Sequence, residues 1–160
     1  MHRFGFLAIP LLLTGLLVAG CGGGGGDTSS STTSTTTSTG ALSQAEYIAK
    51  GDQICAGGTL VIGQAARAQF GSSQPSRDQA VQFGQDTVVP SLEDTLGKLR
   101  ALQPPAGDQA QTAAIYNALE QGINKLKQDP TLFVESNSGG AFDEANRLAQ
   151  SYGFKQCGQS

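Results

Sequence analysis

The sequence predicts an all-α fold for residues 41–160, an antiparallel bundle of about four helices. Apolar residues recur at spacings of three and four along most of this stretch, which is the period of an amphipathic helix. No segment shows the alternation of apolar and polar residues, or the hairpin turns, that indicate strands. Short connections between helical segments favour antiparallel neighbours. A stretch of about 120 residues suits one domain with one core.

The first predicted helix covers residues 43–70, and Ser43 with Glu46 forms a capping-box pattern at its start. Its apolar or small residues fall on one stripe: Tyr47, Ile48, Gly51, Ile54, Cys55, Gly58, Val61, Ile62 and Ala65. Small residues recur at every seventh position of this stripe, so we expect a facing helix to approach its backbone closely: Gly51, Gly58 and Ala65. An interior glycine costs about 1 kcal/mol against alanine, so a break at Gly57 and Gly58 is the alternative to the preferred continuous or kinked helix.

A second helix is predicted between Ser76, which forms a capping pattern with Gln79, and Leu102. Its apolar face consists of Val81, Val88, Leu92, Leu96 and Leu99. Pro90 lies in its middle, where it removes one backbone hydrogen bond and its ring presses on the carbonyl of Asp86. We therefore expect a kink, which lets the helix curve around its core more often than it lines a groove.

A break at residues 104–107 separates this helix from a third, which Asp108 with Gln111 is expected to cap. The third helix carries Ile115, Leu119, Ile123 and Leu126 on one side. Asp129 and Pro130 then predict the cap and first residue of a short segment over residues 131–135.

The last predicted helix follows a polar turn at residues 136–140. It carries Phe142, Ala145, Ala149 and Tyr152 at helical spacing. Gly153 ends it, and Phe154 is placed to fold back on it in a glycine-type C-cap.

Residues 1–20 have the layout of a secretory signal peptide, with Arg3 before an apolar run. That run, residues 4–19, is shorter than the roughly 20 apolar residues of a membrane-spanning helix and contains Pro10 and Gly15. A permanent membrane span is therefore the weaker interpretation.

The signal segment ends in a sequence that resembles the lipobox of bacterial lipoproteins: Val18, Ala19, Gly20 and Cys21. In a lipobox the cysteine sulfur receives a diacylglycerol, and the chain is cleaved on the N-terminal side of that cysteine. We expect Cys21 to be the first mature residue and the membrane anchor; the alternative is an ordinary cleavage site that happens to end in cysteine. Residues 22–40 are rich in Gly, Ser and Thr, which predicts a flexible tether, as a plain spacer rather than a glycosylated stalk.

Cys55 and Cys157 remain once Cys21 is assigned to lipid, and we expect them to pair in an oxidising exterior compartment. The bond would close a loop of about 100 residues and stabilise the fold by up to about 4.7 kcal/mol in the chain-entropy model. It would require the last helix to pack against the first, with α-carbons about 5 to 6 Å apart.

The chain lacks the side chains of common catalytic sites. His2 is the only histidine and leaves with the signal peptide, so no imidazole is left for base catalysis or metal binding. Carboxylate chemistry remains, with Glu93 and Asp94 or Asp143 and Glu144 as its candidates. Adjacent helix positions point in different directions, so each pair is expected on a solvated face. We expect no enzyme, no metal and no cofactor.

Two further observations bear on ligands. Tyr47, Tyr116 and Tyr152 could hydrogen-bond a ligand where the helices converge, although core rings with surface hydroxyls are the preferred interpretation. Residues 41–160 hold nine Lys and Arg, the ten of the chain less Arg3, against twelve Asp and Glu, the thirteen less Asp27. There is no basic cluster, so we expect no nucleic-acid binding.

Several segments together resemble a group of uncharacterised small helical lipoproteins of high-GC Gram-positive, actinobacterial-type bacteria. They are the lipobox and polar tether, residues 47–50 leading to Ile54 and Cys55, the linker at residues 102–108, and the ending Tyr152, Gly153 and Phe154 before Cys157 and Gly158. The resemblance covers nearly the whole chain. It implies export, lipidation and the cysteine pair, and it implies no activity and no binding residue.

The sequence leaves three classes of function open. We expect first a non-enzymatic lipoprotein at the outer face of the cytoplasmic membrane, whose helical face binds a protein or envelope partner. The alternative is a carrier or sensor that holds a small apolar ligand between its helices. An enzyme confined to carboxylate chemistry comes third.

Overall fold

A computed structural model describes residues 42–135, 138 and 140–159. Every element among them is helical and none is a strand, which confirms the all-helical prediction for this part of the chain. The predicted signal peptide at residues 1–20, the lipid anchor Cys21 and the tether at residues 22–40 lie outside the described residues. Among the described helices, none combines the length and the apolar character needed to cross a bilayer.

The first helix, α1, spans Gln44–Phe70 without a break, as the preferred interpretation predicted, and the alternative break at Gly57 and Gly58 does not occur. Its predicted capping box is confirmed. The backbone N–H of Glu46 donates to the Ser43 hydroxyl at 3.3 Å, and the Ser43 N–H donates to the Glu46 carboxylate at 3.0 Å. These bonds satisfy backbone donors that lack partners within the first turn.

The second predicted helix consists of three segments. They are α2 (Arg77–Phe83), the π-helical segment η1 (Gly84–Val88) and α3 (Val89–Arg100). These segments follow one another without a gap, and the irregularity near Pro90 is a π-helical segment. Pro90 has no N–H to donate, and just before it the N–H of Val89 donates to the carbonyl of Gly84, the wider spacing of a π-helix.

The third helix, α4 (Gln109–Gln128), is followed by a short 3-10 helix, η2 (Pro130–Val134). The cap predicted for η2 is confirmed, because the Asp129 carboxylate accepts the N–H of Thr131 at 3.0 Å.

The last helix, α5 (Asp143–Tyr152), ends at Gly153 with φ of 114°, a left-handed conformation that favours glycine. The N–H of Phe154 reaches back to the carbonyl of Ala149 at 3.0 Å, which confirms the predicted C-cap.

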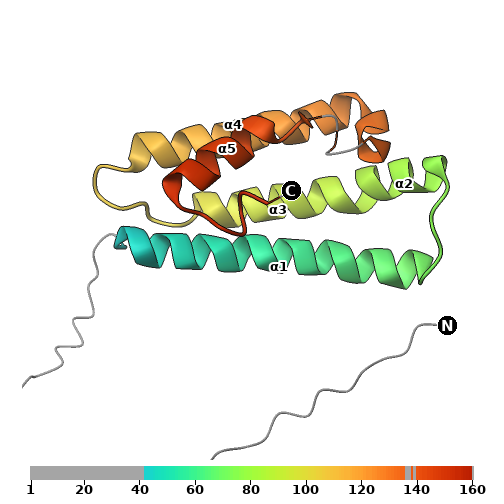
Figure 1. Ribbon diagram of the computed structural model, residues 1–160, viewed down its shortest axis with the longest axis horizontal. Coiled ribbons are helices and arrows are strands. Elements are labelled where there is room, and N and C mark those ends of the chain that lie inside the picture. Colours follow the sequence, from blue (N-terminus) through green and yellow to red (C-terminus); the bar gives the residue numbers. More distant parts are fainter. Residues whose placement is uncertain (1–41, 136–137, 139, 160) are drawn as a thin grey trace, which may run out of the picture. The chain divides into compact units, whose positions relative to one another are not determined.

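The helices lie side by side, with α3 in contact with both α1 and α4, and α5 packed on α4 (Figure 1). Their shared core is built from Tyr47, Val89, Leu96, Leu99, Ile115, Tyr116, Ile123, Leu126, Phe142, Ala149, Tyr152 and Phe154. One predicted stripe position is wrong, since Val61 on α1 is 55% exposed, next to Leu60 at 57%. The helix α1 packs mainly on α3. The face that α1 buries is therefore narrower than its apolar periodicity predicted.

Candidate functional site

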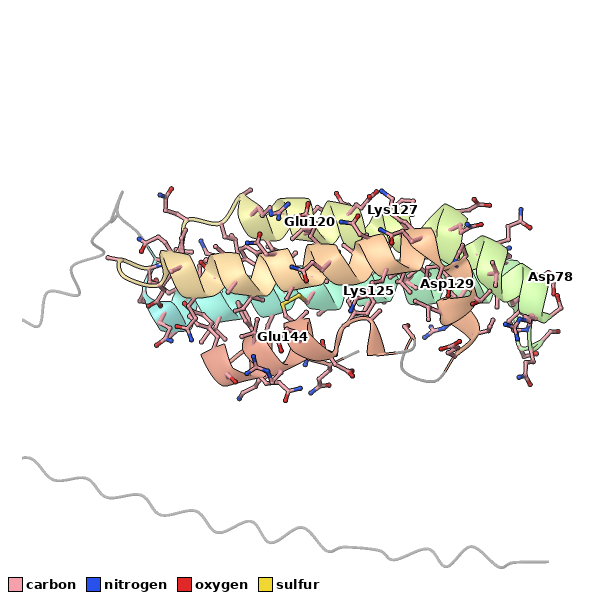
Figure 2. All side chains as sticks on the ribbon, turned by 90° about the horizontal axis from the view of Figure 1, so that it is seen from above. Asp78, Glu120, Lys125, Lys127, Asp129 and Glu144 are labelled. Atoms are coloured by element: carbon pink, nitrogen blue, oxygen red, sulfur yellow. A yellow bond between two sulfur atoms is a disulfide. The ribbon has the colours of Figure 1, made fainter. Side chains whose placement is uncertain are left out.

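A disulfide joins Cys55 to Cys157, as predicted, with α-carbons 5.2 Å apart. Figure 2 shows it as a yellow bond among the helices. The expected packing of the last helix on the first takes a different form. The helix α5 packs mainly on α4, and the segment after it, residues 154–159, crosses to α1. We call residues 154–159 the tail.

A carboxylate on α1 binds the backbone of the tail independently of the disulfide. Asp52 accepts N–H groups from Lys155 at 3.1 Å, from Gln156 at 2.8 Å and from Cys157 at 3.2 Å. Hydrogen bonds to an ionised acceptor are stronger than neutral ones, so Asp52 fixes the course of the tail along α1. Sequence reasoning missed this residue, because its partners are more than 100 positions away and give no local pattern.

Phe154 anchors the beginning of the tail in the core. Its ring lies where a side-chain carbon of Gly51 would be, and it packs against the rings of Tyr47 and Tyr152 at centroid distances of 6.1 and 5.3 Å. The close approach predicted at Gly51 therefore comes from the tail instead of a facing helix.

The close approach predicted at Gly58 does involve a facing helix. The hydroxyl of Thr95 on α3 occupies the space beside its backbone. Because Thr95 donates that hydroxyl to the carbonyl of Ser91 at 2.8 Å, its polar group is satisfied within α3.

An apolar cavity of about 120 Å³ lies where α1, α3, α4, α5 and the tail converge. Its walls are formed by Cys55, Gly58, Thr59, Ile62, Leu92, Thr95, Leu99, Ile115, Tyr116, Leu119, Phe142, Ala145, Asn146, Phe154, Gln156, Cys157 and Gln159. Both disulfide cysteines are among them, so the bond that holds the tail also forms part of the wall.

Three of the lining residues are exposed to solvent: Thr59 on α1, and Gln156 and Gln159 on the tail. The cavity therefore opens between α1 and the tail. Ala145 on α5 is a small residue in these walls, and a bulkier side chain there would take up part of the space.

The three tyrosines are core residues, as preferred, but the surface hydroxyl expected for each is wrong for Tyr47 and Tyr116, whose hydroxyls bond to one another in the interior. Tyr47 is fully buried, and its hydroxyl is hydrogen-bonded to that of Tyr116. Tyr152 donates its hydroxyl to the carboxylate of Asp108 at 2.7 Å. Only Tyr116 contributes to the wall of the cavity.

Burial raises the pKa of Tyr116 above its ordinary value, and the hydrogen bond with Tyr47 adds to the rise. The pKa of Tyr152 is raised by burial and then by its bond to Asp108, because an ionised phenolate beside a carboxylate is unfavourable. Both tyrosines therefore stay neutral at physiological pH.

The predicted side-chain cap of α4 is wrong, and the backbone of Asp108, with φ of −95° and ψ of 0°, lies outside the extended conformation of the N-caps Ser43 and Ser76. Asp108 occupies the cap position, but its carboxylate makes no cap hydrogen bond. The hydroxyl of Thr112 instead donates to the Asp108 carbonyl at 3.1 Å. The Asp108 carboxylate, which the local sequence predicted to cap the helix, is bound instead by Tyr152, 44 positions later in the chain.

The two acidic pairs have the solvated character that was expected. Glu93 pairs with Lys127 of α4 at 2.9 Å, whereas its neighbour Asp94 pairs with Lys98 of its own helix at 2.6 Å. Glu144 pairs with Arg147 of its own helix, α5, where Figure 2 labels it. Because the members of the first pair point to different partners, they do not converge on a shared substrate position. No group of acidic, histidine or cysteine side chains within residues 42–135, 138 and 140–159 is arranged to hold a metal ion.

No protein-family model, no curated protein and no solved structure matches this chain. The cavity between α1, α3, α4, α5 and the tail combines buried apolar walls with a solvent-exposed opening.

Proposed function

We propose that this protein is a lipoprotein anchored through Cys21 to the outer face of the cytoplasmic membrane, and that its antiparallel helical bundle is a carrier or sensor of a small apolar ligand. The cavity between α1, α3, α4, α5 and the tail is the observation that carries the proposal. The protein is not an enzyme in this proposal, which the exposed, separately paired carboxylates of Glu93 and Asp94 support.

The size of the cavity indicates the size of the ligand. A cavity of about 150 Å³ lined by Leu, Ile and Phe stays dry and binds benzene or xenon in another protein. The cavity here is of similar volume, about 120 Å³, and its buried walls also include Leu, Ile and Phe side chains, namely Leu99, Ile115, Phe142 and Phe154. We therefore expect it to take one ring, or an apolar group of about six carbons.

Toluene tests the proposal directly. We would add it to the full chain in lipid nanodiscs and follow the methyl resonances of Ile62, Ile115 and Leu119, which line the cavity. Reading the signal on the protein separates binding from partition into the lipid. We expect saturable shifts of these methyl groups.

A matched pair of variants controls for indirect effects. Ala145→Leu should fill the cavity and abolish the shifts, whereas Ala113→Leu, on the exposed side of α4, should leave them unchanged. Thr59→Trp would cover the opening from an exposed position if the Ala145 variant does not fold. No saturable shift in the unmodified chain would refute the proposal.

The membrane anchor needs a separate experiment. Export to an oxidising compartment agrees with the disulfide between Cys55 and Cys157, since such bonds are rare in the cytosol. Cys21→Ser should abolish incorporation of labelled palmitate, because serine lacks the thiol that receives the diacylglycerol. Cys157→Ser keeps that thiol and should retain the label. A Cys21→Ser variant that is still lipidated would show that the anchor is elsewhere.

The exposed side of α1 favours a second candidate function, binding of a protein or envelope partner through a helical face. Leu60 and Val61 are adjacent, apolar and more than half exposed. A photocrosslinking residue at Leu60 should then capture a discrete partner in intact cells, whereas one at Gln69, also exposed on α1, should not. Equal capture at both positions would count against this surface.

A further inference from the structure

The cavity changes in polarity from its floor to its opening. The buried lining residues include the apolar Leu99, Ile115, Phe142, Ala145 and Phe154. The exposed ones, by contrast, carry a hydroxyl or an amide: Thr59, Gln156 and Gln159. A molecule that enters therefore meets hydrogen-bonding groups at the opening and mainly hydrocarbon beneath them, where the hydroxyls of Thr95 and Tyr116 are already bonded to Ser91 and Tyr47.

Among the described residues, none of those that line the cavity is Asp, Glu, Lys, Arg or His. A charged group drawn into the cavity would lose its hydration without gaining a counter-ion, which is strongly unfavourable, and one held at the opening would gain no counter-ion there either. Asp52, which lies on the same helix and holds the tail, is already engaged by three backbone N–H groups. The chemistry of the walls thus selects against both anions and cations.

The groups at the opening suit a neutral polar end of a ligand. Glutamine amides and threonine hydroxyls can each donate and accept hydrogen bonds. Alcohols, esters and amides are all complementary to such groups. The backbone of Gln156 is fixed on Asp52 by a bond of 2.8 Å, so this position is held at the opening before a ligand arrives.

On the basis of the proposed function, we infer that the ligand is an uncharged amphiphile. Its apolar body occupies the cavity, and its hydroxyl or carbonyl end lies at the opening beside Thr59, Gln156 and Gln159. The inference narrows the ligand class from apolar molecules in general to neutral ones with one polar end.

Five probes that share one aromatic ring test this inference: toluene, benzyl alcohol, benzamide, benzoate and benzylammonium. Benzamide and benzoate are nearly the same size and differ in charge, as do benzyl alcohol and benzylammonium. Each would be titrated into the full chain in nanodiscs, with the methyl groups of Ile62 and Leu119 as the signal. We expect the two neutral polar probes to bind at least about tenfold more tightly than the two charged ones.

Two variants locate the polar end of the ligand. Thr59→Val and Gln156→Leu should each weaken benzyl alcohol binding several-fold relative to toluene binding of the same variant. Gln64→Leu, at an exposed position of α1 outside the cavity, is the matched control and should change neither.

The outcomes separate this inference from the proposed function. If toluene binds and the charged probes bind as tightly as their neutral counterparts, the inference is wrong while the carrier function stands. It is also wrong if neither variant at the opening weakens benzyl alcohol. If no probe binds, toluene included, both proposals fall together.

Discussion

Asp52 on α1 accepts a backbone hydrogen bond of 2.8 Å from Gln156, which lies 104 positions later in the chain. Two neighbouring N–H groups, of Lys155 and Cys157, donate to the same carboxylate. One side chain thus sets the course of the tail over α1, and with it the edge of the cavity opening. The disulfide between Cys55 and Cys157 joins the tail to α1 covalently, in addition to the hydrogen bonds that Asp52 accepts.

Asp52→Asn should destabilise the fold with the disulfide intact. The variant loses the negative charge and one acceptor oxygen, so we expect a loss of about 1 to 3 kcal/mol in the free energy of unfolding by urea. Asp94→Asn is the control, since Asp94 pairs only with Lys98 on an exposed helix face and should change stability by less than about 1 kcal/mol. Equal losses in the two variants would show that Asp52 does not hold the tail.

Removal of the disulfide should lower stability without removing the helices. The double variant Cys55→Ser with Cys157→Ser should lose about 2 to 5 kcal/mol, as is typical of small secreted domains. Circular dichroism at low temperature should still show the helical content, because the core of α3, α4 and α5 does not depend on the bond. A helical signal that collapses on reduction at low temperature would contradict this expectation.

Two alanine substitutions within α1 should change the free energy of unfolding in opposite directions. Gly51→Ala places a carbon where the ring of Phe154 lies, so overpacking should cost about 1 to 3 kcal/mol. Gly57→Ala meets no neighbouring atom and should stabilise the helix by up to about 1 kcal/mol. Thermal or urea unfolding of both variants measures the difference. Stabilisation by both would mean that Phe154 does not pack on α1.

Stability should fall at alkaline pH because of Tyr116 and Tyr152. In the folded protein both have a pKa raised above the ordinary value near 10. Their contribution to the free energy of unfolding is therefore complete below about pH 10 and is lost as pH rises further. In the unfolded chain these hydroxyls ionise, whereas in the folded chain they resist ionisation. Phenolate absorbance should therefore lag behind that of the urea-unfolded protein.

Tyr152→Phe provides the control for this alkaline transition. It removes one of the two shifted groups, so the decline of the unfolding free energy between about pH 9 and 11 should become shallower. An unchanged slope would show that Tyr152 ionises normally in the folded state.

Local features of the fold were predictable because their signals lie within one or two turns. The capping boxes at Ser43 and Ser76 each pair a hydroxyl with a residue three positions later, and both are present. The C-cap at Gly153 depends on a conformation that glycine adopts readily. The disulfide could be inferred because only two cysteines remained after Cys21 was assigned to lipid.

Features that depend on distant partners could not be derived from spacing. Asp108 has the local pattern of a cap, yet its carboxylate binds Tyr152. Pro90 predicted a distortion, but the π-helical form is accompanied by packing of the Phe133 ring against Gly84, which belongs to another part of the chain. The cavity arises from the separation of several helices, so its lining residues had no signature of their own.

The positions of the two cysteines also determine how the domain responds to tension. A force that pulls the two ends of the helical domain apart passes from α1 through the sulfur atoms to the tail, and it can extend only the stretches before Cys55 and after Cys157. Of the residues that line the cavity, all but Gln159 lie at or between these cysteines. A protein held to a membrane at one end and pulled at the other would therefore keep its ligand site inside a closed covalent loop that bears no load.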